Sequence, residues 1–141
     1  MNSIRERILR TLHQRLTAAL APVEVLRQHP TPLSRDTGSV LLLIVEGESI
    51  GERSNRLVDR VLTLRLVAGA RGAQTFDAAD LLLVAAHQAL LADPGLGGLA
   101  LGLRELDCEW DSDDADTGTV AMPARYEVRY RTLVNDLRLI N

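Results

Sequence analysis

Carboxylates are the most concentrated group of chemically active side chains, and they follow one another from residue 105 to residue 116. Closely spaced carboxylate oxygens could hold a hard cation such as Ca²⁺. The EF-hand pattern fails, because counting from Asp111 places Gly118 eighth instead of sixth and Met122 where a glutamate is needed. The sequence therefore predicts no metal site. A solvated turn and a surface that docks arginines of a neighbouring subunit both stay open for the acidic tip, which comprises Asp111, Asp113, Asp114 and Asp116.

The histidines and the single cysteine form no recognisable catalytic or metal-binding pattern. His13, His29 and His87 fall in three different expected elements, and none has a second ligand at helical spacing. Cys108 alternates with apolar neighbours, so we expect it to be a small buried side chain. No Walker, G-x-S-x-G or H-E-x-x-H sequence occurs, and all 16 basic residues are arginine. We therefore expect no catalytic residue, no cofactor and no enzymatic activity.

A second candidate surface is basic. Arg125, Arg129 and Arg131 alternate with apolar residues near the end of the chain, so they share one face of a predicted strand, while Arg65 lies on another strand. This face could contact a partner protein, or it could be a solvated face with cross-strand ion pairs. Because the first helix is also rich in arginine and the acidic tip lies elsewhere, head-to-tail contacts that close into a ring are suggested.

Composition indicates an ordinary globular chain. The 141 residues are 46% hydrophobic and 25% charged, which predicts one domain over residues 1–141. The net charge of −3 argues against a nucleic-acid protein that works through a bulk positive field. The longest apolar runs are far shorter than a membrane span, and the N-terminus does not resemble a signal peptide. We therefore expect no membrane partner and a chain that folds in the cytoplasm.

Two helices are expected from the spacing of apolar residues. Ser3 and Glu6 form a capping box at the start of the first helix, and Pro22 ends it. Its apolar stripe is Ile4, Ile8, Leu12, Leu16 and Ala19, widened by Leu9 and Leu20. The second helix, over residues 75–91, has only a narrow polar strip and should therefore touch more than one surface.

The strands cluster rather than alternate with the helices. Residues 47–55 are predicted to form a polar loop. In the fourth strand the apolar residues before and after residue 104 alternate in different registers, and a bulge near residue 104 or 105 would place both sets on the same face. The last two strands should form a hairpin. The predicted class is α+β, with a mainly antiparallel sheet of about five strands packed against two helices in the order α-β-β-β-α-β-β. The expected strands cover residues 23–27, 40–45, 62–67, 99–110 and 119–131.

Four short sequences, in their order along the chain, carry a resemblance to a known family. They are I-R-E-R-I-L-R-T-L at residues 4–12, L-L-A-D-P-G-L-G-G-L at 90–99, E-W at 109–110 and Y-E-V-R-Y-R-T at 126–132. With the order of elements, they resemble the tail terminator or tail completion proteins of tailed bacteriophages, of the minor tail protein U type. Of these features, the glycine-rich helix end and the final tyrosine-rich strand are the most specific.

This resemblance implies a small α+β subunit that forms a hexameric ring on the head-proximal end of the tail tube. There it would stop tube polymerisation and join the tail to the head. The implied partners are further copies of the chain, the tail tube protein and the head–tail connector protein. The implied location is the bacterial host cytoplasm during assembly and then the virion tail. The family has no fixed set of functional residues to carry over, so the candidate contacts remain the arginine face and the acidic tip.

Two other functions stay open. The chain could be another head–tail joining or baseplate protein of the same particle. It could also be a small enzyme or ligand-binding domain, with a pocket between the second helix and the sheet that includes Asp80 and His87. A flat or filled interface at that place would argue against the second alternative.

Overall fold

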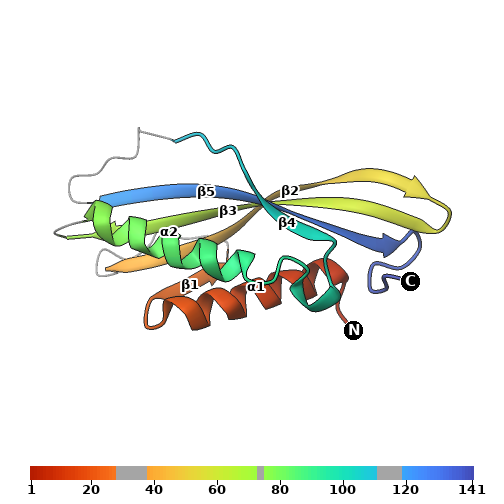
Figure 1. The fold of residues 1–141 in the computed structure, drawn as a ribbon, viewed down its shortest axis with the longest axis horizontal. Helices are drawn as coiled ribbons and strands as arrows, with labels where there is room; N and C mark the ends of the chain where they lie inside the picture. Colours follow the sequence, from red (N-terminus) through yellow and green to blue (C-terminus); the bar gives the residue numbers. More distant parts are fainter. Residues whose placement is uncertain (28–37, 73–74, 111–118) are drawn as a thin grey trace.

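The computed structural model describes residues 1–27, 38–72, 75–110 and 119–141. The predicted α+β class and the order α-β-β-β-α-β-β are confirmed (Figure 1). A short 3₁₀ turn, η1, lies between the second helix and the fourth strand. The elements are α1 (Ile4–Leu20), β1 (Glu24–Arg27), β2 (Ser39–Ser54), β3 (Leu57–Arg71), α2 (Thr75–Leu91), η1 (Leu96–Gly98), β4 (Gly102–Leu106) and β5 (Thr119–Leu133).

The five strands form one mixed sheet in the order β1-β2-β3-β5-β4. Among the strands that the structure describes, β1 and β2 run parallel and the other neighbouring pairs are antiparallel, so the expected antiparallel pairing of the last two strands is confirmed. Figure 1 shows α1 and α2 on the same side of the sheet. The opposite side, which we call the helix-free face, carries no helix among the described residues.

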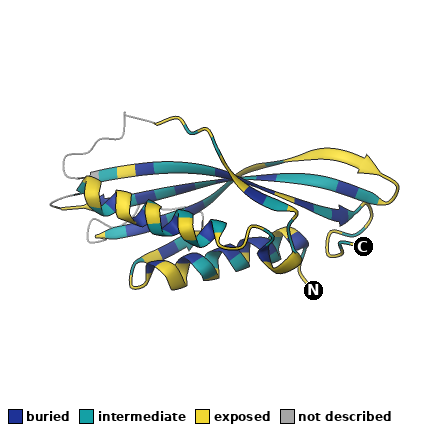
Figure 2. Ribbon diagram, viewed as in Figure 1, coloured by how far each residue is buried: buried dark blue, intermediate teal, exposed yellow. Residues whose placement is uncertain are grey.

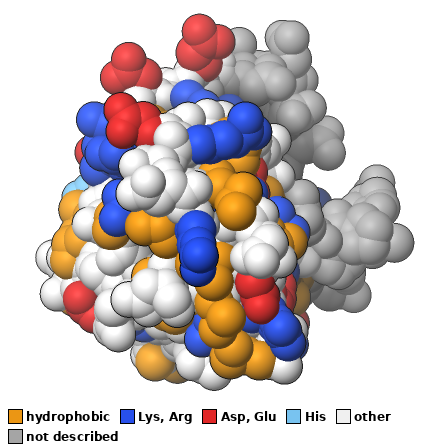
Figure 3. All heavy atoms as spheres, turned by 90° about the vertical axis from the view of Figure 1, so that its right-hand side faces the viewer, with side chains coloured by type: hydrophobic (Ala, Val, Ile, Leu, Met, Phe, Trp, Pro, Cys, Tyr) orange, Lys and Arg blue, Asp and Glu red, His pale blue; other side chains and the backbone are white. Residues whose placement is uncertain are grey.

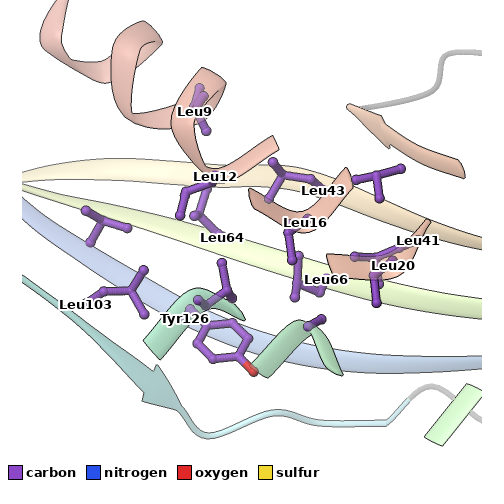
Figure 4. Packing of buried hydrophobic residues seen from close by; sticks show 14 of the residues in the cluster. Leu9, Leu12, Leu16, Leu20, Leu41, Leu43, Leu64, Leu66, Leu103 and Tyr126 are labelled. Carbon is purple, nitrogen blue, oxygen red and sulfur yellow. The ribbon is translucent and has the colours of Figure 1, made fainter. Parts of the chain in front are cut away.

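The core lies between the two helices and the sheet (Figure 4). Ser3 caps α1 by accepting a hydrogen bond from the Glu6 amide at 3.1 Å, which confirms one half of the predicted capping box, whereas the Glu6 carboxylate pairs with Arg10 and Arg27. The apolar stripe of α1 is buried except at Ala19, which is exposed, because Leu20 takes the inward position in the last turn. Alternate residues of β2 and β3 face this stripe: Leu41, Leu43, Leu62, Leu64 and Leu66.

The expected polar loop at residues 47–55 is wrong. This stretch belongs to β2, which continues to Ser54 and pairs with β3 across a turn at Asn55, whose φ is 56°. Two register shifts, between Val45 and Gly47 and between Ile50 and Arg53, interrupt the ladder. The end of β2 is exposed in Figure 2, so its backbone pairs without burying side chains, and polar composition does not prevent a strand there.

The fourth strand is much shorter than expected. It spans only Gly102–Leu106 and pairs with β5 in an uninterrupted register, so the expected bulge at residue 104 or 105 is wrong. The strand is preceded by η1, in which Gly97 and Gly98 have φ values of 68° and 98° that favour glycine. Cys108 is half-buried rather than buried, because the strand ends at Leu106 and the chain leaves the sheet.

Candidate functional site

All four predicted arginines lie on the helix-free face of the sheet. Arg125, Arg129 and Arg131 alternate along β5, and Arg65 on β3 stands directly opposite Arg125. The structure therefore brings together the arginines that the sequence singled out on separate strands. The acidic tip, Asp111, Asp113, Asp114 and Asp116, lies outside the described residues.

Glu46 neutralises the closest arginine pair. Like charges directly opposite each other on neighbouring strands destabilise a sheet. The Glu46 Oε1 atom lies 3.1 Å from the Nε atoms of both Arg65 and Arg125. Glu46 can serve both because it is the extra residue at the first register shift of β2. Sequence reasoning missed Glu46, since nothing local marks the position of that shift.

Two further ion pairs occupy the same face. Arg131 Nε donates to Asp59 Oδ1 at 2.6 Å, and this hydrogen bond lowers the pKa of the Asp59 carboxyl. Arg104 pairs with Glu127, whose side chain is largely buried. Arg129 differs from its neighbours, because it is exposed and forms no ion pair within the part of the chain that the structure describes. It lines a shallow groove of about 460 Å³ together with Val61 and Leu101.

Because Arg125 is paired and Arg129 has no ion pair among the described residues, replacing each of them by glutamate should have different effects on stability. Arg125→Glu should lower the free energy of unfolding by about 1–2 kcal/mol, because it places a carboxylate beside Glu46 and removes a 2.8 Å hydrogen bond to the Asp107 carbonyl. Arg129→Glu should change it by less than about 0.5 kcal/mol. Urea denaturation of both variants measures the difference, and an equal loss of stability would contradict it. Arg129→Glu is therefore the cleaner variant for testing a role of this face in assembly.

The outward side of α2 forms a second candidate surface. Ala79, Leu82, Ala86 and Leu90 are buried against the rest of the chain. Other apolar residues of the helix stay uncovered: Phe76, Leu81 and Val84 are 65%, 66% and 47% exposed. Figure 2 shows this mixture of buried and exposed positions along the helix. Exposed apolar patches on a folded domain mark interaction sites, so α2 presents the apolar surface that its composition predicts.

A groove of about 530 Å³ lies beside α2, between the helix and the end of the β4–β5 pair. His87 lines it and shares a 2.8 Å hydrogen bond between Nδ1 and the Tyr126 hydroxyl. Burial, followed by the nearby Glu105 carboxylate, raises the pKa of Tyr126 to about 12, so the hydroxyl keeps its proton at neutral pH. Trp110 also lines the groove and is 61% exposed.

The groove fits the ligand-binding alternative only in part. His87 lines it as that alternative requires, whereas Asp80 does not. The other two histidines lie elsewhere: His13 Nε2 is 2.8 Å from the Val25 carbonyl, and His29 is outside the described residues. Across residues 1–27, 38–72, 75–110 and 119–141, no group of three or more His, Cys, Asp or Glu side chains is placed to hold a metal ion.

Of the helices that the structure describes, none has the length and apolar character needed to cross a membrane. In comparisons with known proteins, no family model and no curated protein matches this chain.

Proposed function

We propose that the chain is a structural subunit of a bacteriophage tail, of the tail-terminator kind. The observation that carries this proposal furthest is the apolar surface that α2 leaves uncovered in the single chain. Burying such a surface against a partner contributes a favourable hydrophobic term of about 25 cal/mol per Å² of apolar surface, which opposes the entropic cost of association. The sequence resemblance supplies the kind of assembly in which this happens.

In this proposal the subunits form a hexameric ring on the head-proximal end of the tail tube. The ring stops tube polymerisation and offers a surface to the head–tail connector protein. Its partners are copies of itself, the tube protein and the connector, and it works without a cofactor or a catalytic step. The subunit is made in the bacterial host cytoplasm and ends in the virion tail. The ion-paired helix-free face supports such a role, because cross-strand pairs stiffen a sheet that must keep its shape in an assembly.

Disruption of the gene in the phage or prophage genome that encodes the chain tests the proposal. Electron microscopy of induced particles should show tails of uncontrolled length and heads without tails, and the wild-type gene supplied in trans should restore normal particles. Tails of normal length that remain detached from heads would favour a head–tail joining protein instead. Loss of baseplates alone would favour a baseplate protein. Normal particles would contradict any role in the tail.

A second candidate function rests on the groove beside α2, whose volume of about 530 Å³ is within the range typical of small-molecule sites. Trp110 is the only tryptophan of the chain and lines this groove, so its fluorescence reports on occupancy. If the groove binds a small molecule, a panel of apolar compounds should include one that changes the emission saturably. The change should disappear in His87→Ala. No saturable change across the panel would leave the assembly role as the better explanation of this surface.

A further inference from the structure

We propose that two copies of this chain associate head to tail, with the acidic apolar face of one copy receiving the basic apolar end of the next. The acidic apolar face comprises Phe76, Asp77, Asp80, Leu81 and Val84 on α2 together with the groove lined by Trp110. The basic apolar end comprises Arg56, Val134, Leu137, Arg138 and Leu139. This inference rests on the proposed function and names the surfaces through which the ring would form.

The acidic apolar face combines uncovered apolar side chains with negative charge on α2 that no ion pair among the described residues compensates, and Arg125, which also lines the groove, is already paired with Glu46. Asp77 and Asp80 flank the exposed apolar residues of the helix, and neither forms an ion pair with any described residue. The 17 residues of α2 contain no arginine. Glu105 lines the groove, and Glu109 stands between the groove residues Cys108 and Trp110 in the sequence; both glutamates are exposed. A partner that covers this face must therefore supply both apolar side chains and positive charge.

The basic apolar end has the complementary character. Val134 and Leu137 are 56% and 49% exposed, and Leu139 is exposed as well. The segment is held in place by backbone hydrogen bonds, from Val134 to the Arg56 carbonyl at 2.6 Å and from Ile4 to the Leu137 carbonyl at 2.8 Å. These bonds keep the apolar side chains outside the core.

Arginine side chains lie near these apolar side chains. Arg56 is exposed and has no carboxylate partner among the described residues. Arg138 pairs with Asp136, at 2.9 Å between Nη2 and Oδ2, and the Arg7 guanidinium donates to the Arg138 carbonyl nearby. Figure 3 looks onto this end of the molecule and shows hydrophobic side chains lying among arginines. The end therefore offers apolar side chains that can cover those of the acidic apolar face, together with the positive charge that α2 lacks.

The positions of the two surfaces favour a head-to-tail contact over a two-fold one. In Figure 1 the start of α2 lies at the left of the long axis and the C-terminal segment lies at the right. A two-fold contact through α2 would pair this face with itself, and because α2 contains no arginine it would supply no positive charge to Asp77 and Asp80. A contact between different surfaces of the same chain continues from one copy to the next and closes into a ring when the rotation allows it.

The groove beside α2 can receive an apolar side chain of the next copy. Leu83, Val84 and Leu106 line it, so an aliphatic side chain that enters meets apolar walls. Val134 and Leu137 are exposed aliphatic side chains of the opposite end and could fill such a groove in the next copy. An apolar centre that is depleted of charged groups, surrounded by a polar rim, is typical of protein interfaces.

Single variants measured by light scattering and sedimentation test each surface. The wild-type chain should form oligomers larger than a dimer as concentration rises. Leu81→Glu, on the face, and Val134→Glu, on the end, should each weaken self-association by about 30-fold, the effect of losing one anchor residue. Leu101→Glu is the matched control, because Leu101 is an exposed leucine outside both surfaces and should change nothing. Circular dichroism confirms that each variant remains folded.

A mixture of the two variants distinguishes head-to-tail from two-fold association. Leu81→Glu keeps an intact end and Val134→Glu keeps an intact face, so an equimolar mixture should form heterodimers and nothing larger. If the mixture stays monomeric although each variant is folded, or if both single variants assemble like the wild type, the proposed surfaces are wrong. The phage experiment still decides the tail function in that case. A wild-type chain that remains monomeric at every concentration would overturn the head-to-tail contact itself.

Discussion

Leu12→Ala is expected to lower the free energy of unfolding by about 3–5 kcal/mol, at the upper end of what truncating one buried leucine costs. Leu12 is fully buried at the middle of α1, where it faces the leucines of β2 and β3 (Figure 4). Removing its side chain takes away apolar burial and leaves a cavity, because α1 is held by the leucines on both sides of the site and cannot collapse onto it. Domains of this size are stable by about 5–15 kcal/mol, so this one substitution should remove a large fraction of the stability of the protein.

Thermal and urea denaturation of Leu12→Ala measure this loss. Leu101→Ala is the matched control, since Leu101 is exposed and its truncation should cost less than about 0.5 kcal/mol. A loss below about 1 kcal/mol for Leu12→Ala would mean that α1 does not complete the core. The packing of α1 against the sheet would then be looser than the burial of its leucines indicates.

Glu48→Leu should cost about 3 kcal/mol, because Glu48 is the shared acceptor of a half-buried polar cluster. The Tyr130 hydroxyl donates to Glu48 Oε1, and Glu48 Oε2 lies 3.3 Å from Arg5 Nη1 and 3.6 Å from Arg60 Nη1. Burial first, and then this hydrogen bond, raise the pKa of Tyr130 well above its usual value. Without the carboxylate, the Tyr130 hydroxyl loses its acceptor and the Arg60 guanidinium loses its counter-ion, keeping among the described residues only the 3.1 Å hydrogen bond from Nε to Thr132 Oγ1 in a site that water reaches poorly.

Urea denaturation of three variants separates the contributions. Glu48→Gln keeps an acceptor for Tyr130 and should lose less stability than Glu48→Leu. Arg5→Ala should cost at most about 1 kcal/mol, because the Arg5 side chain is 47% exposed and its pair with Glu48 is screened by solvent. If Glu48→Leu were as stable as the wild type, apolar packing would be replacing the cluster without penalty. The Glu48 carboxylate would then contribute no net stability to the fold.

Local patterns in the sequence were sufficient to predict the helices and the class of fold. The capping box at Ser3 and the helical spacing of apolar residues act within one or two turns, so α1 could be predicted almost to the residue. The alternation in β5 likewise separates Tyr126, Val128 and Tyr130 from the arginines on the other face. The excess of apolar residues in α2 correctly indicated a helix with more apolar surface than one core face can bury.

Pairing between strands that lie far apart in the sequence could not be predicted from local patterns. The polar end of β2 is a strand because β3 supplies hydrogen-bond partners along its length, and residues 47–55 alone contain no sign of that partner. The same holds for β4, where the alternating apolar pattern continues beyond Leu106 although pairing with β5 ends there. Backbone hydrogen bonds between strands depend on which segments meet, and composition reports mainly on burial.

For the candidate surfaces, too, some features could be predicted from the sequence and others depended on the tertiary structure. Residue types and periodicity were enough to place Arg125, Arg129 and Arg131 on one strand face and to identify the apolar excess of α2. Tertiary contacts settled which of those arginines is paired, because Glu46 and Asp59 come from other strands and reach the arginines only through the sheet register. Side-chain periodicity is a property of a single element, whereas charge compensation and exposure are properties of neighbours that only folding brings together.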